Sequence, residues 1–195
     1  MRKKICLGGS FNPIHHAHLL CGRAAAEAVG AATVVLIPSG QAPHKHQEDI
    51  APSEDRLAMC REAVEKVPGF EVDDRETRRA GPSFTIQTVR QLKQEGWEQV
   101  CWLIGADMLN TLPSWHQPIA LIQEAHLLIM ARPGWAFDWD SLGPPFQELR
   151  QNVVQVPQID ISATEIRQRV RAGRPIEYLT PPAVCRYIHD RKLYR

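Results

Sequence analysis

Two glycines and three histidines lie close together near the start of the chain, within the stretch GGSFNPIHHAH at residues 8–18. Glycine lets the backbone turn tightly and approach a ligand closely. The first turn of a helix presents unpaired N–H groups and a positive dipole end to an anion. His15 and His18 lie at the expected helix start, where their rings can add hydrogen-bond donors. The stretch therefore predicts a binding site for the phosphates of a nucleotide.

Other interpretations of these histidines remain open. Histidines in a loop can simply be solvated, and neutral imidazoles also bind zinc. Two clusters could supply zinc ligands, His15, His16 and His18 and the pair His44 and His46. Against zinc, the chain has no H-E-x-x-H motif and no cysteine spaced as a partner ligand. The dinucleotide-binding motif G-x-G-x-x-G and the P-loop motif G-x-x-x-x-G-K-[ST] are also absent.

A second anion site is predicted from the sequence ISATEIR at residues 161–167. Ser162 and Glu165 have the spacing of a capping box, which places a helix start at or near Ser162. The free N–H groups of that helix, the hydroxyls of Ser162 and Thr164, and the guanidinium of Arg167 can converge on one phosphate. The alternative for Arg167 is a solvated position on an exposed helix face.

Three further residues have both a chemical and a structural interpretation. Lys45 is either a solvated loop residue or a mobile positive charge for a polyphosphate. Asp107 either caps a helix or binds a ribose or a metal-bound phosphate. Trp115 either packs in the core or offers a flat indole face to an aromatic ring. Because no G-x-S-x-G motif marks an activated serine, the sequence favours catalysis by positioning and charge stabilisation over covalent catalysis.

Alternating strand and helix patterns predict the framework that positions these residues. Apolar runs are expected to form strands at residues 5–7, 32–37, 70–72, 99–104, 125–130 and 153–156. Helices are expected at residues 19–29, 53–67, 83–95, 106–112, 119–124, 162–173 and from 181 onward. Ser53 and Ser83 are predicted as N-caps, and the helix after Ser53 is predicted to carry its apolar face on Leu57, Cys60, Val64 and Val67. Residues 38–52 are predicted as a long loop, and residues 73–81 as a charged, exposed segment.

This alternation predicts an α/β fold, a Rossmann-like, doubly wound parallel sheet with helices on both faces and further helices at the C-terminal end. Residues 1–195 are expected to form a single domain whose C-terminal helical part spans about 162–195. Ligands of such sheets bind beyond the carboxyl ends of the strands. The glycine pair, the loop after Ile37 and the turn after Ile104 are expected there.

Composition limits the class of protein. The net charge of +1 gives no broad attraction to nucleic acid, so phosphate binding has to come from local placement. The five cysteines are widely spaced, with no C-x-x-C, which favours a reducing compartment over a disulfide framework. No apolar run is long enough for a signal peptide or a membrane span. We therefore expect a soluble, cytoplasmic protein that binds neither nucleic acid nor membranes.

The same residues carry a resemblance to a known family. The stretch at residues 8–18 resembles the G-G-[ST]-F-[DN]-P turn and the H-x-G-H signature of nucleotidyltransferases. Nearly the whole chain is similar to bacterial nicotinate mononucleotide adenylyltransferases, through GGSFNPIH with His18, PHK at 43–45, PSFT at 82–85, LIGAD at 103–107, LP at 112–113 with Trp115, RPG at 132–134, ISAT at 161–164 with Arg167, and IEYL at 176–179 with Pro181. The sequence departs from the pattern at Ala17, Ala42, Ala163 and His116.

The resemblance implies a reaction and a role for each matching residue. The 5′-phosphate of nicotinate mononucleotide would attack the α-phosphorus of ATP, giving deamido-NAD and pyrophosphate in NAD biosynthesis. Mg²⁺ would be held mainly by the ATP phosphates, with no protein metal site. The catalytic residues would be His15, His18, Lys45 and Arg167. ATP would be bound by Gly8, Gly9, Ser10, Phe11, Ile104, Gly105, Ser162 and Thr164, and the mononucleotide by Thr85, Asp107 and Trp115.

Two other functions fit parts of the sequence. A phosphopantetheine adenylyltransferase would belong to the same superfamily, but it gives no reason for Trp115 or for the long C-terminal helices. A non-catalytic nucleotide sensor would bind ATP without needing two phosphate sites. The strength of the preference for nicotinate over nicotinamide mononucleotide stays open at this point. So does the oligomeric state, and a homo-oligomer is compatible with the sequence.

Overall fold

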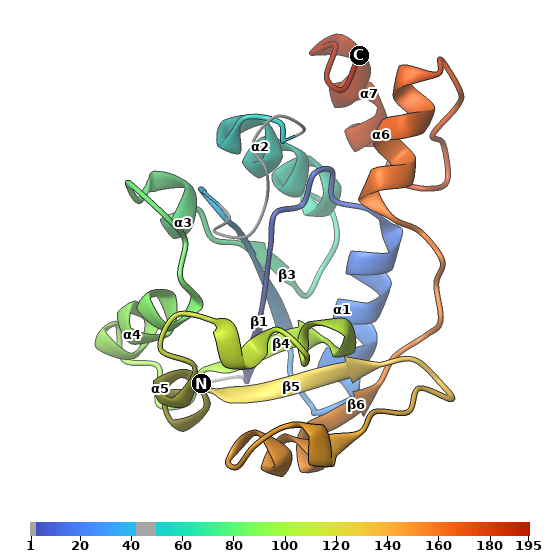
Figure 1. Cartoon of the computed structure of the whole chain (residues 1–195). Coiled ribbons are helices and arrows are strands. Elements are labelled where there is room, and N and C mark those ends of the chain that lie inside the picture. The colour runs from blue at the N-terminus through green and yellow to red at the C-terminus, as the bar shows by residue number, and fades with distance from the viewer. Residues whose placement is uncertain (1–2, 42–49) are drawn as a thin grey trace. The chain divides into compact units, whose positions relative to one another are not determined.

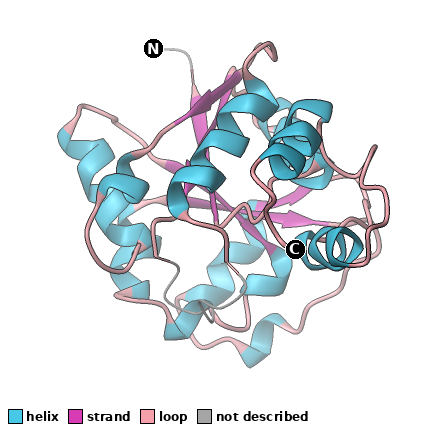
Figure 2. Cartoon of the chain, turned by 90° about the horizontal axis from the view of Figure 1, so that it is seen from above, coloured by secondary structure: helices cyan, strands magenta, loops and turns pink. Residues whose placement is uncertain are grey.

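One sheet of six strands organises the chain, which is described here by a computed structural model covering residues 3–41 and 50–195. The strand order is β3-β2-β1-β4-β5-β6. The strands are β1 (Lys4–Gly9), β2 (Thr33–Pro38), β3 (Phe70–Val72), β4 (Cys101–Gly105), β5 (His126–Ala131) and β6 (Val153–Gln155). Every strand expected from the sequence is confirmed, with bounds shifted by no more than two residues. Figures 1 and 2 show the strands flanked by helices.

Parallel pairing confirms the predicted α/β, Rossmann-like class. The pairs β1·β4, β4·β5 and β5·β6 are parallel, and the register sets Cys6 opposite Trp102 and Leu103 opposite Leu128. The sequences of these strands are nearly continuous apolar runs, because helices cover both faces of a parallel sheet. Leu103, Leu127 and Ile129 are accordingly almost completely buried.

The chain divides into two compact units. Unit 1 comprises Met1–Gly8, Cys21–Val35 and Phe84–Gln158. Its helices are most of α1 (His16–Ala28), α4 (Thr85–Gln94), α5 (Pro118–Glu124) and the 3₁₀ helices η2 (Ala106–Met108), η3 (Leu112–Ser114), η4 (Trp139–Ser141) and η5 (Phe146–Asn152). A bidentate ion pair between Arg90 and Glu124, with Nη2 and Oε1 2.7 Å apart, joins α4 to α5.

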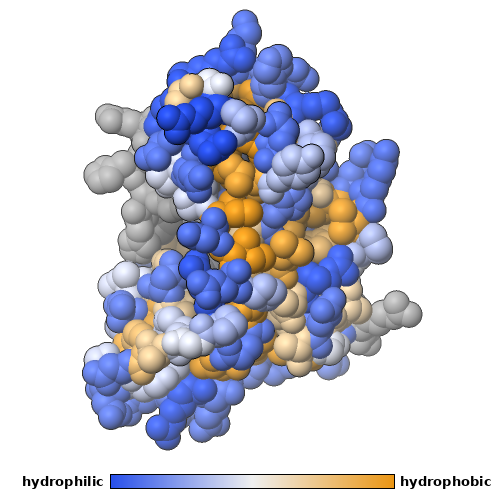
Figure 3. All heavy atoms as spheres, turned by 90° about the vertical axis from the view of Figure 1, so that its right-hand side faces the viewer, coloured by the Kyte–Doolittle hydropathy of each residue, from blue (hydrophilic) through white to orange (hydrophobic). Residues whose placement is uncertain are grey.

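Unit 2 comprises Gly9–Leu20, Leu36–Ser83 and Ile159–Arg195. Its helices are α2 (Ser53–Val64), α3 (Arg75–Arg78), α6 (Ala163–Arg171) and α7 (Pro182–Asp190). Helix α7 is tied to α2 through the buried Asp55, which accepts from the Tyr187 hydroxyl at 2.8 Å and from Arg191 Nε at 3.2 Å. The end of unit 2 that carries α6 and α7 is mostly hydrophilic on its surface, at the top of Figure 3.

Several helix predictions are wrong in detail. Helix α1 begins at His16 rather than at residue 19, so His18 lies in its first turn. Helices α2 and α4 have Pro52 and Phe84 at the N-cap position, not Ser53 and Ser83, and neither has a side-chain cap. The Ser83 hydroxyl is used elsewhere, since it accepts the backbone N–H of Gly40 at 2.9 Å.

Two other segments differ from their predictions. The helix expected at residues 106–112 consists of the separate 3₁₀ helices η2 and η3, and η3 contains Pro113, which cannot donate a helical hydrogen bond. The segment predicted as exposed at residues 73–81 contains α3, whose Glu76 is buried. The buried side of α2 is confirmed at Cys60 and Val64 but not at Leu57 or at Val67, which lies beyond the helix and is exposed. The other buried residues of this helix are Asp55, Arg56, Met59 and Ala63.

Within the residues that the structure describes, no helix combines the length and apolar character needed to cross a membrane. None of the five cysteines, all of which belong to the described part of the chain, forms a disulfide.

Candidate active site

The predicted site residues fall into two groups, one in each unit. Unit 2 holds Gly9, Ser10, Phe11, His15, His18, Ser162, Thr164 and Arg167, and unit 1 holds Gly8, Thr85, Ile104, Gly105, Asp107 and Trp115. Each group is described by itself. Lys45, with the rest of the PHK motif, lies outside the described residues.

The glycine pair does not make the tight turn that the sequence suggested. Gly8 and Gly9 continue β1, and the left-handed backbone conformation belongs to Phe11, with φ of 45°. At Gly8 a Cβ atom would collide with the indole of Trp102, which is itself buried. Glycine is therefore required at position 8 by packing inside unit 1, and the chain turns three residues later.

A compact cluster of three rings follows that turn. The imidazoles of His15 and His18 are stacked with centroids 3.7 Å apart, and the Phe11 ring meets His18 edge-on at 5.1 Å. The backbone N–H of His15 donates to Nδ1 of His18 at 3.2 Å. In neutral His18 the proton therefore sits on Nε2, so Nε2 is the donor nitrogen of this ring. The structure thus confirms that His15 and His18 lie together and fixes the orientation of one of them.

His15 itself is held neutral. Only 5% of the residue is exposed, and burial, with a smaller contribution from the charge of His16, lowers its pKa from 6.5 to about 4. Its buried Nδ1 has no hydrogen-bond partner among the described residues. A buried polar nitrogen without a partner is costly, and a ligand that accepted its hydrogen bond would offset that cost.

This shifted pKa predicts a pH-dependent stability. Between about pH 4 and 6.5 the unfolded chain binds a proton at His15 that the folded chain does not. The free energy of unfolding should therefore fall as the pH is lowered through this window, and His15 should have no such effect above it. Between pH 7.5 and pH 4.5 the loss from this one residue should be about 2–3 kcal/mol.

Urea unfolding of the wild type and of His15→Gln at both pH values measures this. The difference between the two proteins isolates His15, because the other titrating groups are common to both. An equal pH dependence in the two proteins would contradict the assignment.

Helix α6 begins as the sequence predicted. Ser162 is its N-cap, and its Oγ accepts the backbone N–H of Glu165 at 3.1 Å. One turn later Arg167 reaches back to the β1–α1 loop, where its Nη1 donates to the carbonyl of Asn12 at 3.0 Å. Its Nη2 lies 3.4 Å from the Thr164 hydroxyl, and its buried Nε has no partner in the described part of the chain. Arg167 is therefore not a freely solvated helix residue.

In unit 1, Asp107 lies in η2, directly after the end of β4. Ile104 is buried, and Gly105 ends the strand as the N-cap of η2, so Asp107 is not the cap of the helix that follows. A Cβ atom on Gly105 would collide with the Asp107 carboxylate, which is exposed. The glycine thus allows the carboxylate to lie against the end of the strand, where it can accept hydrogen bonds from hydroxyl groups.

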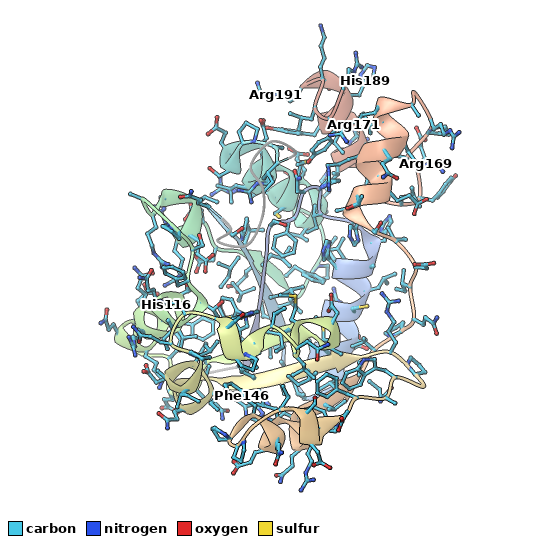
Figure 4. The ribbon with its side chains drawn as sticks, in the orientation of Figure 1. His116, Phe146, Arg169, Arg171, His189 and Arg191 are labelled. Carbon is cyan, nitrogen blue, oxygen red and sulfur yellow. The ribbon has the colours of Figure 1, made fainter. Side chains whose placement is uncertain are left out.

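Thr85 and Trp115 belong to neighbouring segments of unit 1. Phe84, directly before Thr85, stacks on His116, directly after Trp115, with ring centroids 4.2 Å apart; His116 is labelled beside α4 in Figure 4. The indole of Trp115 is half-buried, and its Nε1 lies 3.4 Å from the Thr111 hydroxyl. The structure therefore brings these two predicted residues near each other, and Trp115 is not part of the buried core.

Sequence reasoning missed three residues that hold the β1–α1 loop. Arg56 is 2% exposed and donates to the carbonyls of Ser10, Gly40 and Ala51. Asn12 and Tyr194 are hydrogen-bonded to each other. Arg56 has the helical spacing of the buried residues Cys60 and Ala63, but its charge normally indicates an exposed position.

Comparisons with known proteins agree with this geometry. A model of the cytidylyltransferase-like family matches residues 6–169. A probable nicotinate-nucleotide adenylyltransferase of Herpetosiphon aurantiacus is 42% identical over 197 residues, covering 100% of this chain and 99% of that protein. A protein of Roseiflexus sp. with the same name is 41% identical over 97% of this chain and 96% of its own length. The structure of Plasmodium falciparum nicotinic acid mononucleotide adenylyltransferase complexed with NaAD has the same fold, with a TM-score of 0.76 at 18% identity over 99% of this chain and 98% of the other.

Proposed function

The chain belongs to the nicotinate-nucleotide adenylyltransferases of the cytidylyltransferase-like family, and we propose that it transfers the adenylyl group of ATP to nicotinate mononucleotide. An oxygen of the mononucleotide 5′-phosphate forms a bond to the α-phosphorus of ATP. The bond from that phosphorus to the bridging oxygen of the β-phosphate breaks, so that deamido-NAD and pyrophosphate are the products. The attacking group is already an anion at neutral pH, so the step needs no general base.

The observation that carries the phosphate part of this proposal is the pair of buried nitrogens without partners in unit 2. His15 Nδ1 and Arg167 Nε both belong to side chains that lie along the β1–α1 loop, and neither has a hydrogen-bond partner among the described residues. Hydrogen bonds to phosphate oxygens would compensate the cost of burying them. Burial keeps His15 neutral, so the positive charge offered to the phosphates comes from Arg167 and not from His15.

Each residue of this group then has a role. His18 donates from Nε2 to the triphosphate, and the rings of His15 and Phe11 hold its imidazole in place before the substrate arrives. Such preorganised donors act on charge that develops as pyrophosphate leaves. Arg167 and Lys45 supply positive charge to the same phosphates. Gly9, Ser10 and Phe11 together with Ser162 and Thr164 line the adenylate side. Gly8, Ile104 and Gly105 of unit 1 stay assigned to ATP by the family resemblance alone.

The proposed metal arrives with the nucleotide. Magnesium in nucleotide sites commonly keeps phosphate and water ligands, so that Mg²⁺ would be held mainly by ATP. When bound, Mg²⁺ neutralises part of the charge on the leaving pyrophosphate.

The mononucleotide part of the proposal rests on α4, whose start carries no side-chain cap. The first N–H groups that bond within the helix are those of Gln87 and Thr88, both to the Phe84 carbonyl. The N–H groups of Thr85 and Ile86 therefore precede the helical hydrogen bonds and are available to a carboxylate at the positive end of the helix. We propose that they bind nicotinate, that Asp107 binds the ribose, and that Trp115 stacks on the pyridine ring.

Pyrophosphate release with ATP and Mg²⁺ tests the proposed function. Nicotinate mononucleotide should be the best acceptor, with a kcat/KM at least about tenfold above that of its amide. In the amide, the NH₂ group would face a backbone N–H at the start of α4, and that N–H would lose its acceptor. Phosphopantetheine should give no product. A protein that binds ATP but releases pyrophosphate with none of the three would be a nucleotide sensor instead.

The variant Thr85→Pro isolates the backbone N–H. Proline is tolerated at the first position of a helix, and the extended conformation of Phe84 (φ −94°, ψ 124°) suits a residue before proline. Thr85→Pro should remove the preference for nicotinate, whereas Thr85→Val, which keeps the N–H, should retain it. An unchanged preference in Thr85→Pro would exclude this N–H as the carboxylate donor.

Trp115→Ala should raise the KM for nicotinate mononucleotide roughly threefold to tenfold more than the KM for ATP. The reason is the loss of ring stacking, which adds about 0.5–1.5 kcal/mol beyond the buried area. Trp97→Ala is the matched control, since this half-buried tryptophan follows the opposite end of α4. If both KM values change equally in Trp115→Ala, the indole has only a packing role.

A further inference from the structure

The loop between β1 and α1 is held in unit 2 by groups from distant parts of the chain. We name residues 10–15 the nucleotide loop. The carbonyl of Ser10 accepts from Arg56 in α2, and the carbonyl of Ile14 accepts from the Thr180 hydroxyl at 2.6 Å. Between these two points lies Asn12, which is 4% exposed. The position of this loop therefore depends on how Asn12 is held.

Both the side chain and the backbone of Asn12 are held by hydrogen bonds. Its Oδ1 accepts the backbone N–H of Ala51 at 3.0 Å and the hydroxyl of Tyr194 at 2.8 Å. Its carbonyl accepts Nη1 of Arg167 at 3.0 Å. One residue thus connects Tyr194 to the arginine that is proposed to bind the triphosphate.

The attachment of α7 within unit 2 does not depend on Tyr194. It follows the end of α7 at Asp190 and has a left-handed backbone conformation, with φ of 63°. Helix α7 is attached to α2 independently, because Tyr187 and Arg191 both bond to Asp55; Arg191 is labelled in Figure 4. Burial raises the pKa of the Tyr194 phenol, so the hydroxyl stays a donor throughout the neutral range.

We propose that Tyr194 is a positioning residue for ATP, acting through Asn12 on the nucleotide loop and on Arg167. The inference rests on the proposed function only in taking ATP as the ligand of this loop. In this role Tyr194 acts without direct contact to a substrate. Its hydroxyl restrains the rotation of the Asn12 side chain, and the carbonyl of Asn12 in turn orients the guanidinium of Arg167.

The variant Tyr194→Phe tests this by removing one oxygen atom and keeping the ring. The KM for ATP should rise about threefold to tenfold, the usual consequence of losing one partly buried hydrogen bond. The KM for nicotinate mononucleotide should stay unchanged, because its proposed contacts come from Thr85, Asp107 and Trp115. Calorimetric titration with a non-hydrolysable ATP analogue should show the same weakening without turnover.

Tyr187→Phe is the matched control. It also removes a phenol oxygen hydrogen-bonded within unit 2, but it acts on the attachment of α7 to α2 and leaves Asn12 untouched. Urea midpoints of both variants show whether each is folded and how much stability each has lost. Only Tyr194→Phe should weaken ATP binding, even if the two variants lose similar stability.

The possible failures are distinguishable. Wild-type protein that binds the ATP analogue but forms no deamido-NAD would refute the proposed function, and the titrations would still test Tyr194. Equal ATP affinities for Tyr194→Phe and wild type, or an equal weakening in Tyr194→Phe and Tyr187→Phe, would overturn the positioning role. A wild type that does not bind the analogue would overturn both.

Discussion

Replacing His18 with alanine should lower turnover by about 10²–10³ while the fold survives, since this is the usual cost of losing one preorganised donor to developing charge. The imidazole is oriented before substrate binds by three contacts, the His15 N–H on Nδ1, the stacked His15 ring and the edge of Phe11. The hydrogen bond to Nδ1 places the proton of the neutral ring on Nε2, which makes Nε2 the donor. Because the effect arises mainly as the α–β phosphate bond breaks, kcat should fall more than the affinity for ATP.

Steady-state kinetics with circular dichroism checks this result. His16→Ala is the matched control, because it removes the adjacent imidazole from the same helix turn, and it should keep turnover within a few-fold of wild type. A folded His18→Ala protein with near wild-type turnover would refute the catalytic role.

Replacing Arg56 with methionine should lower the free energy of unfolding by about 3–5 kcal/mol, because three carbonyl acceptors would lose their donor and each such loss costs about 1–3 kcal/mol. The guanidinium is almost completely buried and donates to the carbonyl of Ala51 at 2.9 Å and to those of Ser10 and Gly40 at 2.7 Å each. Methionine fills similar space but leaves three acceptors without their donor. Burial already lowers the pKa of this arginine, which reflects the cost of holding its charge away from water.

Urea or guanidinium unfolding measures the change. Arg61→Met serves as the control on the same helix, because its ion pair with Asp74 is largely exposed and should contribute no more than about 1 kcal/mol. Arg56→Lys, which keeps a charge but has fewer donors in a different geometry, should fall between the two. A loss in Arg56→Met no larger than that in Arg61→Met would show that the buried hydrogen bonds contribute little.

The sheet could be predicted because its signal is local. After their first residues the runs at β2, β4 and β5 are apolar, and they end at Pro38, Gly105 and Ala131. Each strand can therefore be predicted without reference to the rest of the chain. The Ser162 cap was predictable for the same reason, since the hydroxyl and the N–H it accepts are three residues apart.

What the sequence did not reveal depends on distant partners. The start of α1 is fixed at His16 in part by a hydrogen bond from its N–H to the carbonyl of Leu179. Ser83 fails to cap α4 because its hydroxyl accepts from Gly40, 43 residues away. Arg56 carries a charge that normally indicates exposure. Its burial is stabilised by hydrogen bonds to three backbone carbonyls, which the sequence alone does not reveal. The stack of Phe84 on His116 likewise has no local pattern.

The sequence separation of these bonds has a consequence for synthesis on the ribosome. The glycines and histidines of residues 8–18 are translated early, but Ile14 and Asn12 wait for partners 166 and 182 residues further along. Such non-local contacts form late, because a long segment must be ordered before they close. A nascent chain therefore carries the histidines that we propose as catalytic before the hydrogen bonds that hold their loop can form. The nucleotide loop acquires its geometry only once residues 179–194 have emerged and docked.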